Sequence, residues 1–156
     1  MHKHLRRLPL IREQTPLYFI TTCTYQRKPI LAVPGVALIL MEEWREALSR
    51  HGWKTGRYVI MPDHVHFFCS VSEETAKSLP RFMQAWKQWT SKRLVCECDL
   101  SSPVWQAGFF DHLLRSSESA MQKWEYVIEN PVRASLVERS KDWPWQGEIF
   151  PFEMQL

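Results

Sequence analysis

Two histidines one residue apart, His64 and His66, interrupt the apolar run IMPDHVHFFC at residues 60–69. In an extended chain, residues two apart point to the same side of a sheet, so the two imidazoles should stand side by side with Val65 facing away. A neutral imidazole can donate a nitrogen lone pair to a divalent ion. The pair therefore indicates either part of a metal site or two histidines that line a polar face or bond to backbone carbonyls.

A second set of reactive groups occurs in EYVIENPVR, residues 125–133. Tyr126 and Asn130 are four residues apart and would share one face of a helix. A tyrosine hydroxyl can act as a covalent nucleophile when its phenolate is favoured, and an asparagine oxygen suits a hard metal ion. The alternatives are that Tyr126 packs as a helix aromatic and that Asn130 caps the helix. Their occurrence together with the histidine pair strengthens the functional interpretation.

Strands and helices must bring these two segments together. Aromatic and β-branched stretches predict strands at 16–28, 53–71 and 103–116, where the second is one long strand or two halves joined at residues 61–63. Helical spacing and capping residues predict helices at 34–52, ending at Gly52, at 72–95, opening at Ser72 with a kink or reset at Pro80, and at 117–130, ending near Pro131. The tail after residue 130 has no regular pattern.

This order of elements predicts an α+β fold, a ferredoxin-like split βαβ arrangement with one antiparallel sheet and the helices on one face. The 156 residues are enough for one domain spanning 1–156, with a basic N-terminal segment (1–15) and an irregular C-terminal tail (131–156). That fold hosts many activities and does not by itself decide function.

Charge and cysteine content narrow the class of protein. The net charge is only +3, but MHKHLRRLPLIR at residues 1–12 and the stretch 77–93 each carry several cations and no acid. Such clusters suit phosphate backbones, although a solvated amphipathic helix explains the second equally well. The four cysteines show no disulfide or zinc spacing, and no apolar run indicates a signal peptide or a membrane span. We expect a protein of the reducing cytoplasm.

Four blocks in series, VIMPDHVHFF, VWQAGFFDHLLRS, YVIENPVRASLVE and DWPW, resemble the REP-associated tyrosine transposases. These are domesticated relatives of insertion-sequence transposases in the HUH single-tyrosine family, which act on single-stranded DNA. The resemblance extends from about Tyr18 to about Trp145, and it implies the HUH nuclease fold.

The resemblance implies a role for each matching residue. His64 and His66 match the two metal-binding histidines, Tyr126 matches the nucleophile, and Asn130 stands where the third metal ligand comes. Many insertion-sequence relatives have glutamine there, and asparagine is shorter. His112 and Arg115 fall in the DH..R block, which shapes the site or contacts DNA.

The implied activity is metal-dependent cleavage and strand transfer of single-stranded DNA through a 5'-phosphotyrosine intermediate, with Mg²⁺ or Mn²⁺ as cofactor. The implied partner is palindromic repeat DNA that folds into a hairpin, and the resemblance implies a bacterial cytoplasmic protein that is associated with the nucleoid when bound to DNA. Candidate DNA contacts are the cations and indoles outside the catalytic set: Arg6, Arg7, Arg115, Arg133, Trp143 and Trp145. For the two tryptophans, packing of the tail against the body is an equal alternative.

Two other functions remain open from the sequence. The first is a hairpin-binding protein that has lost catalysis, and the second is a small metal-dependent hydrolase on the same fold. REP-associated members tend to be monomers, and the tail after Pro131 agrees with that group.

Overall fold

A five-stranded antiparallel sheet forms the middle layer of the protein. The computed structural model describes residues 16–152. The sheet has the order β4-β1-β3-β2-β5. Its strands are β1 (Leu17–Cys23), β2 (Trp53–Ile60), β3 (His64–Val71), β4 (Phe110–Leu114) and β5 (Gln146–Glu148).

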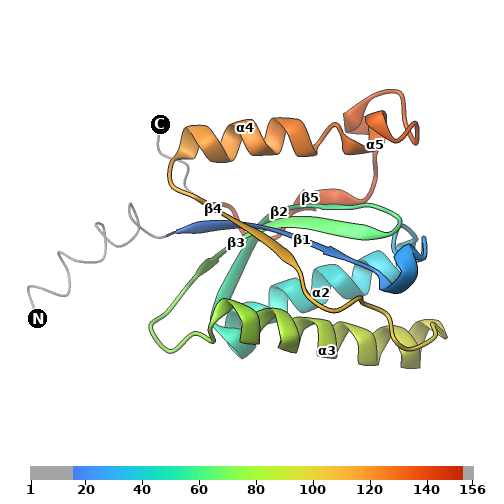
Figure 1. Cartoon of the computed structure of the whole chain (residues 1–156), viewed down its shortest axis with the longest axis horizontal. Helices are drawn as coiled ribbons and strands as arrows, with labels where there is room; N and C mark the ends of the chain where they lie inside the picture. The colour runs from blue at the N-terminus through green and yellow to red at the C-terminus, as the bar shows by residue number, and fades with distance from the viewer. Residues whose placement is uncertain (1–15, 153–156) are drawn as a thin grey trace, which may run out of the picture.

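Helices cover both faces of this sheet (Figure 1). On one face lie α2 (Pro34–His51) and α3 (Leu79–Cys98), and on the other lies α4 (Ser117–Val127), followed by the short α5 (Asn130–Arg133). Two single turns, η1 (Tyr25–Arg27) and η2 (Ser140–Asp142), complete the described elements. The α+β fold and the antiparallel sheet are confirmed, but the expectation of helices on one face is wrong for α4. The strands carry apolar side chains on both sides, so both faces must be covered.

The layer between the sheet and α2 and α3 is an aromatic core. Trp44 of α2 and Trp86 of α3 stack with ring centroids 5.3 Å apart, and both rings also contact Phe67 of β3. Each of the two tryptophans is fully buried. Rings of this size dominate the burial of apolar area, so this layer supplies most of the hydrophobic stabilisation.

A tight hairpin joins β2 to β3 and carries the histidine pair. The segment 61–63 turns the chain, and the Met61 amide donates to the His64 carbonyl at 2.8 Å. Two neighbouring loops hold the outside of the turn, because Leu31 N donates to Pro62 O and Thr24 N donates to Asp63 O, each at 2.9 Å. Of the two alternatives for residues 53–71, the two-strand form is therefore confirmed.

The start of α3 differs from the prediction. The helix begins at Leu79 with Ser78 as its N-cap, and Pro80 lies in the first turn, where a missing amide proton costs nothing. Ser72 instead donates its hydroxyl to the Gly52 carbonyl at 3.0 Å. Its capping chemistry is thus used to join the end of β3 to the end of α2, a contact distant in sequence.

The segment after α4 is more regular than predicted. The helix expected to run to residue 130 ends at Val127, and Asn130 opens the separate helix α5 with Pro131 in its first turn. The tail then adds β5, which pairs with β2 through the register Tyr58↔Gly147. Among residues 16–152 no helix is long and apolar enough to cross a membrane.

Candidate active site

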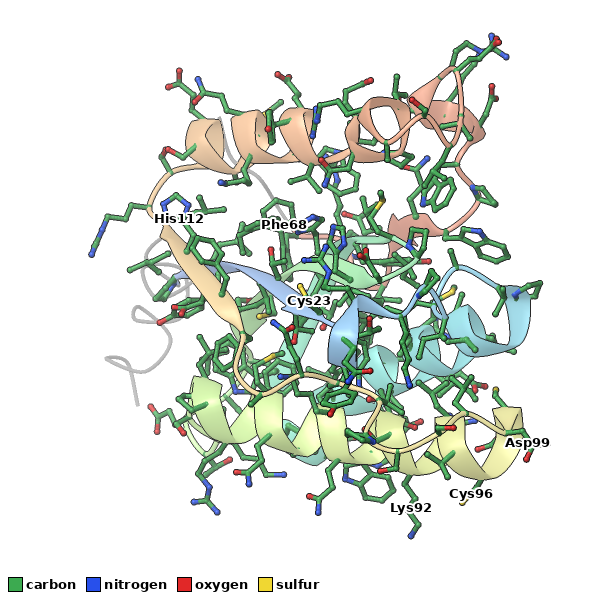
Figure 2. The ribbon with its side chains drawn as sticks, turned by 45° about the vertical axis from the view of Figure 1, so that its right-hand side comes forward. Cys23, Phe68, Lys92, Cys96, Asp99 and His112 are labelled. Carbon is green, nitrogen blue, oxygen red and sulfur yellow. The ribbon has the colours of Figure 1, made fainter. Side chains whose placement is uncertain are left out.

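The histidine pair lies on the face of the sheet that α4 covers. Along β3, Val65 and Phe67 belong to the core under α2 and α3, whereas Phe68 belongs to the second apolar cluster, with Val127 of α4. Because side chains alternate along a strand, His64 and His66 share the face of Phe68. Figure 2 shows Phe68 between the sheet and α4. The prediction that the two imidazoles stand side by side is confirmed, with ring centroids 4.8 Å apart.

One nitrogen of each imidazole is already bonded, and it is the same nitrogen in both. The Nδ1 atom of His64 lies 2.7 Å from the Asp63 carboxylate, and the Nδ1 atom of His66 lies 2.7 Å from the Thr21 hydroxyl. Within residues 16–152 neither Nε2 atom has a hydrogen-bond partner. A carboxylate only accepts, so His64 donates from Nδ1, and the neutral ring then carries its lone pair on Nε2. The Thr21 hydroxyl can accept from His66 in the same way.

The protonation of the second histidine suits a metal ligand. Burial, the repulsion of a protonated His64 and the charges of Lys123 and Arg133 together lower the pKa of His66 to about 3. His66 is therefore neutral near pH 7, as a ligand must be. Lys123 belongs to α4 and Arg133 to α5. Lys123 Nζ lies 5.1 Å from the centre of the Phe19 ring, which stacks on His66, so α4, the helix that carries Tyr126, faces the histidine pair.

Asp63 is itself held by a second contact. Arg27 of η1 donates from Nε to the other carboxylate oxygen at 2.9 Å. Burial raises the pKa of Asp63, but the hydrogen bonds from His64 and Arg27 outweigh this effect and lower it. The carboxylate thus stays charged and oriented, which fixes the ring of His64 in the manner of the outer-shell partners of metal-binding histidines.

Tyr126 and Asn130 lie close together but on two elements. Tyr126 is in the last turn of α4 and is 65% exposed, and Asn130 is the first residue of α5. Arg133 connects them, since its Nη2 atom donates to the Tyr126 carbonyl at 2.7 Å and to Asn130 Oδ1. The expectation of one continuous helix is wrong, because the chain turns at residues 128 and 129.

The donor set can hold a divalent ion. No group of three His, Cys, Asp or Glu side chains that could bind a metal occurs among the described residues. The third ligand predicted from the sequence, the amide oxygen of Asn130, is of another type. The hydrogen bonds at the two Nδ1 atoms fix the orientation of both rings, and two Nε2 atoms held in this way could bind a divalent ion.

The sequence matches a known protein family over most of its length. Residues 15–130 match the family described as "Transposase IS200 like". The chain belongs to the IS200-like transposase family. Membership in this family supports a DNA-processing enzyme.

Individual relatives agree with the family. The chain is 27% identical over 124 residues to a Haemophilus influenzae protein that carries a provisional name as a REP-associated tyrosine transposase, covering 69% of this chain and 70% of that one. It is also 27% identical over 88 residues to the REP-associated tyrosine transposase of Escherichia coli, covering 56% of this chain and half of that one. The resemblance seen in the sequence is confirmed.

Solved structures show the same fold. A REP-associated tyrosine transposase bound to a REP hairpin superimposes with a TM-score of 0.65 at 18% identity, covering 90% of each chain. A Deinococcus radiodurans protein described provisionally as a transposase gives a TM-score of 0.56 at 22% identity, covering 72% of this chain and 88% of that one.

The DNA contacts predicted for this IS200-like transposase occupy different surroundings. Arg6 and Arg7 lie outside the described residues. Arg115 is exposed just after β4. Trp143 is buried and donates from its indole nitrogen to the Ile60 carbonyl at 3.0 Å, so the packing alternative accounts for it. Trp145 is half-buried and packs against both apolar clusters.

The basic stretch 77–93 is mostly engaged within the protein. Lys77 contacts His51, and Lys87 donates to the carbonyls of Gln106 and Gly108. Arg93 bonds to a set of carboxylates on α2 and α3: Glu42, Glu43 and Glu97. Lys92 points into solvent from α3 (Figure 2). This stretch lies on the layer opposite the histidines, which favours the interpretation of an amphipathic helix.

One exposed aromatic beside the histidines was not among the residues predicted from the sequence. Phe110 of β4 is 59% exposed and pairs in register with Thr21, the residue that holds His66. His112, two residues on, pairs with Phe19, whose ring stacks on His66. His112 lies on the α4 side of the sheet in Figure 2. The signal was available, because residues two apart in a strand share a face, so Phe110 lies on the same face as His112.

Proposed function

We propose that this protein cleaves and rejoins single-stranded DNA beside a hairpin, through a covalent bond between Tyr126 and a 5'-phosphate. The observation that carries the proposal is the pair of imidazoles whose Nδ1 atoms are bonded and whose Nε2 atoms are free, facing the helix of an exposed tyrosine. Family membership and a hairpin-bound structure of the same fold support it.

In the cleavage step, the Tyr126 oxygen attacks the phosphorus of a phosphodiester and loses its proton. The bond from phosphorus to the 3'-oxygen of the preceding nucleotide breaks, and that oxygen takes up a proton to become a free 3'-hydroxyl. The energy of the broken ester is kept in the tyrosine ester, so a 3'-hydroxyl can reverse the step on another strand. Cleavage and joining thus use one site.

His64, His66 and Asn130 would hold a divalent ion, Mg²⁺ or Mn²⁺, that offsets charge on the phosphate oxygens. Thr21 and Asp63 orient the two rings, and Arg27 holds Asp63 in place. These residues prepare the nitrogens before an ion arrives, which lowers the cost of assembling the site.

Phe110 extends the same face toward the sheet edge and offers a flat surface for a base. Base stacking on an exposed aromatic tolerates any sequence. Arg115, which follows β4, can meet the phosphate backbone beside it. Together they would guide a single strand past Tyr126.

The test is incubation with labelled hairpin oligonucleotides that have randomised single-stranded flanks, in Mn²⁺, followed by a denaturing gel. We expect a covalent protein–DNA adduct that Tyr126→Phe abolishes and that a chelator prevents. Tyr25→Phe is the matched control, because Tyr25 is another exposed tyrosine, and it should leave the adduct unchanged. Cleavage that survives Tyr126→Phe would refute the assignment of the nucleophile.

The same experiment separates the alternatives. A hairpin-binding protein without catalysis would retain the oligonucleotides and form no adduct. A small-molecule hydrolase would need an enclosed pocket for its substrate, yet a cavity of about 600 Å³ lies between α3 and residues 102–109, away from the histidines. The exposed rings of Tyr126 and Phe110 on the histidine side of the sheet are better suited to a polymer than to a small substrate.

A further inference from the structure

Arg133 makes three contacts within the proposed nucleophile segment. Its guanidinium carbon lies 4.0 Å from the centre of the Tyr126 ring, and its Nη2 atom donates to the Tyr126 carbonyl at 2.7 Å. The same Nη2 atom donates to Asn130 Oδ1. One side chain therefore holds both the predicted nucleophile and the predicted third metal ligand. A guanidinium is suited to this, because it is planar, stacks on rings and donates in a fixed fork.

The contact with Asn130 has a chemical consequence. An asparagine oxygen binds a cation through one of its two lone pairs, and here a charged donor already uses one of them. Charge-assisted hydrogen bonds are about twice as strong as neutral ones. A divalent ion bound to the second lone pair would lie next to the guanidinium cation, so binding through Asn130 favours displacement of Arg133.

The charge of Arg133 also acts at the histidines. Its cation, with that of Lys123, opposes positive charge on His66. Phosphate is a stronger partner for a guanidinium than a neutral amide oxygen, because it is charged and can accept two parallel bonds. A DNA phosphate at Tyr126 would compete for Arg133 with the oxygen of Asn130.

We propose that Arg133 is a positioning residue that masks Asn130 Oδ1 in the free protein and releases it when a DNA phosphate draws the guanidinium away. The third ligand then becomes available only with DNA in place, so DNA and the metal ion bind cooperatively. This inference rests on the proposed function. It gives a structural meaning to Arg133 as a DNA contact, since the phosphate contact and the release of Asn130 are one event.

The test measures Mn²⁺ affinity by electron paramagnetic resonance of the free ion, which needs no catalysis. All variants carry Tyr126→Phe, which prevents cleavage and keeps the ring beneath Arg133. We expect Arg133→Ala to raise Mn²⁺ affinity about tenfold without DNA. Asn130→Ala alone should have little effect, because its oxygen is masked, and the gain from Arg133→Ala should vanish when both substitutions are combined.

A hairpin oligonucleotide pool supplies the second measurement. With the signal of DNA alone subtracted, the pool should raise Mn²⁺ affinity in the reference protein and not in Arg133→Ala. Arg139→Ala is the control, because Arg139 is an exposed arginine bonded to Asp142, and it should change neither value. Arg133→Met keeps the aliphatic stem and replaces the alanine variant if circular dichroism shows that the latter does not fold.

Two results overturn the inference and leave the proposed function intact. One is an Mn²⁺ affinity that stays equal or falls in Arg133→Ala. The other is a gain that persists in the double variant, which shows that Arg133 acts by charge and not through Asn130. If no variant binds Mn²⁺ with or without DNA, the metal site of the proposed function fails and the inference fails with it.

Discussion

The two faces of the sheet differ in the size of the side chains that the covering helices bury. Under α2 and α3, the helices bury large rings that stack on one another, such as Trp44 and Trp86. On the other face, α4 buries only Ala120 and Val127 and leaves Tyr126 exposed. The comparison teaches that one layer supplies stability, so the other can keep polar side chains and loosely held helices next to solvent.

The largest expected effect comes from removing an aromatic ring from the layer between the sheet and α2 and α3. Trp86→Ala should lower the free energy of unfolding by about 3–5 kcal/mol, because it leaves a large cavity among stacked rings. The measurement is urea denaturation followed by circular dichroism. Trp89→Ala is the control on the same helix, since Trp89 is exposed and its ring contacts Arg50, and it should cost less than about 1 kcal/mol. Equal costs would show that α3 does not supply the stability.

Acid should weaken both layers at once, through one buried histidine in each. Burial lowers the pKa of His51 to about 4, with the charges of Lys77 and Arg50 adding to the effect, and it lowers the pKa of His66 to about 3. The unfolded chain binds these protons near pH 6.5 and the folded chain does not, so stability falls as pH drops below 6.5. These shifts correspond to losses of about 3 kcal/mol for His51 and about 5 kcal/mol for His66.

The loss should be complete near pH 4 for His51 and near pH 3 for His66. Urea midpoints measured from pH 7 to pH 3 test this. His51→Gln and His66→Gln should each flatten the slope between pH 6.5 and 4, and only His66→Gln should flatten it below pH 4. A slope that neither substitution changes would contradict the burial of both rings.

Neighbouring threonines sharpen the comparison, because they point to opposite faces. Thr21→Val removes the partner of His66 Nδ1 and should weaken Mn²⁺ binding about tenfold, as outer-shell substitutions do. Thr22→Val, on the other face, removes a bond to the Gly108 carbonyl and should leave Mn²⁺ affinity unchanged. Calorimetric titration of each variant with Mn²⁺ gives the two values. A similar loss in both would mean that the effect passes through the strand and not through the ring.

The smallest expected effect concerns Phe110, the exposed aromatic residue on the histidine side of the sheet. Phe110→Ala should weaken binding of single-stranded DNA about fivefold, which is the lower end for loss of one stacked base. The salt dependence should stay the same, because no charge is removed. Leu38→Ala is the control, as Leu38 is 54% exposed on α2 in the opposite layer. Fluorescence anisotropy at two salt concentrations measures both quantities.

Much of this arrangement could be predicted because it follows from local patterns. The alternation in β3 gave the side-by-side histidines, and Gly52 ends α2 in a left-handed conformation, as its position indicated. The turn at Pro62 was among the predicted alternatives. Each of these features depends on residues within a few positions of one another.

The features that could not be predicted depend on distant partners. Serine is a residue type that often caps helices, but the hydroxyl of Ser72 donates to the Gly52 carbonyl instead. The strand β5 is only three residues long and exists because β2 offers an edge. The bonds of Thr21 and Arg27 to the histidine hairpin join elements that no spacing rule connects. The roles of Tyr126 as nucleophile and Asn130 as ligand stay predictions, since geometry alone does not test them.

The anchoring of the tail has a practical consequence for anyone who shortens this protein. Trp143 bonds to the Ile60 carbonyl, and the Ile60 amide donates to the Trp145 carbonyl at 2.8 Å. Ile60 pairs with Val65, the residue between the two histidines. A truncation before Trp143 would expose the edge of β2 to other chains and remove the contacts that support the β2–β3 hairpin at Ile60. C-terminal truncations should therefore retain all of β5. We expect shorter proteins to aggregate through the exposed edge of β2, and loss of metal binding in such proteins would not test the role of the histidines.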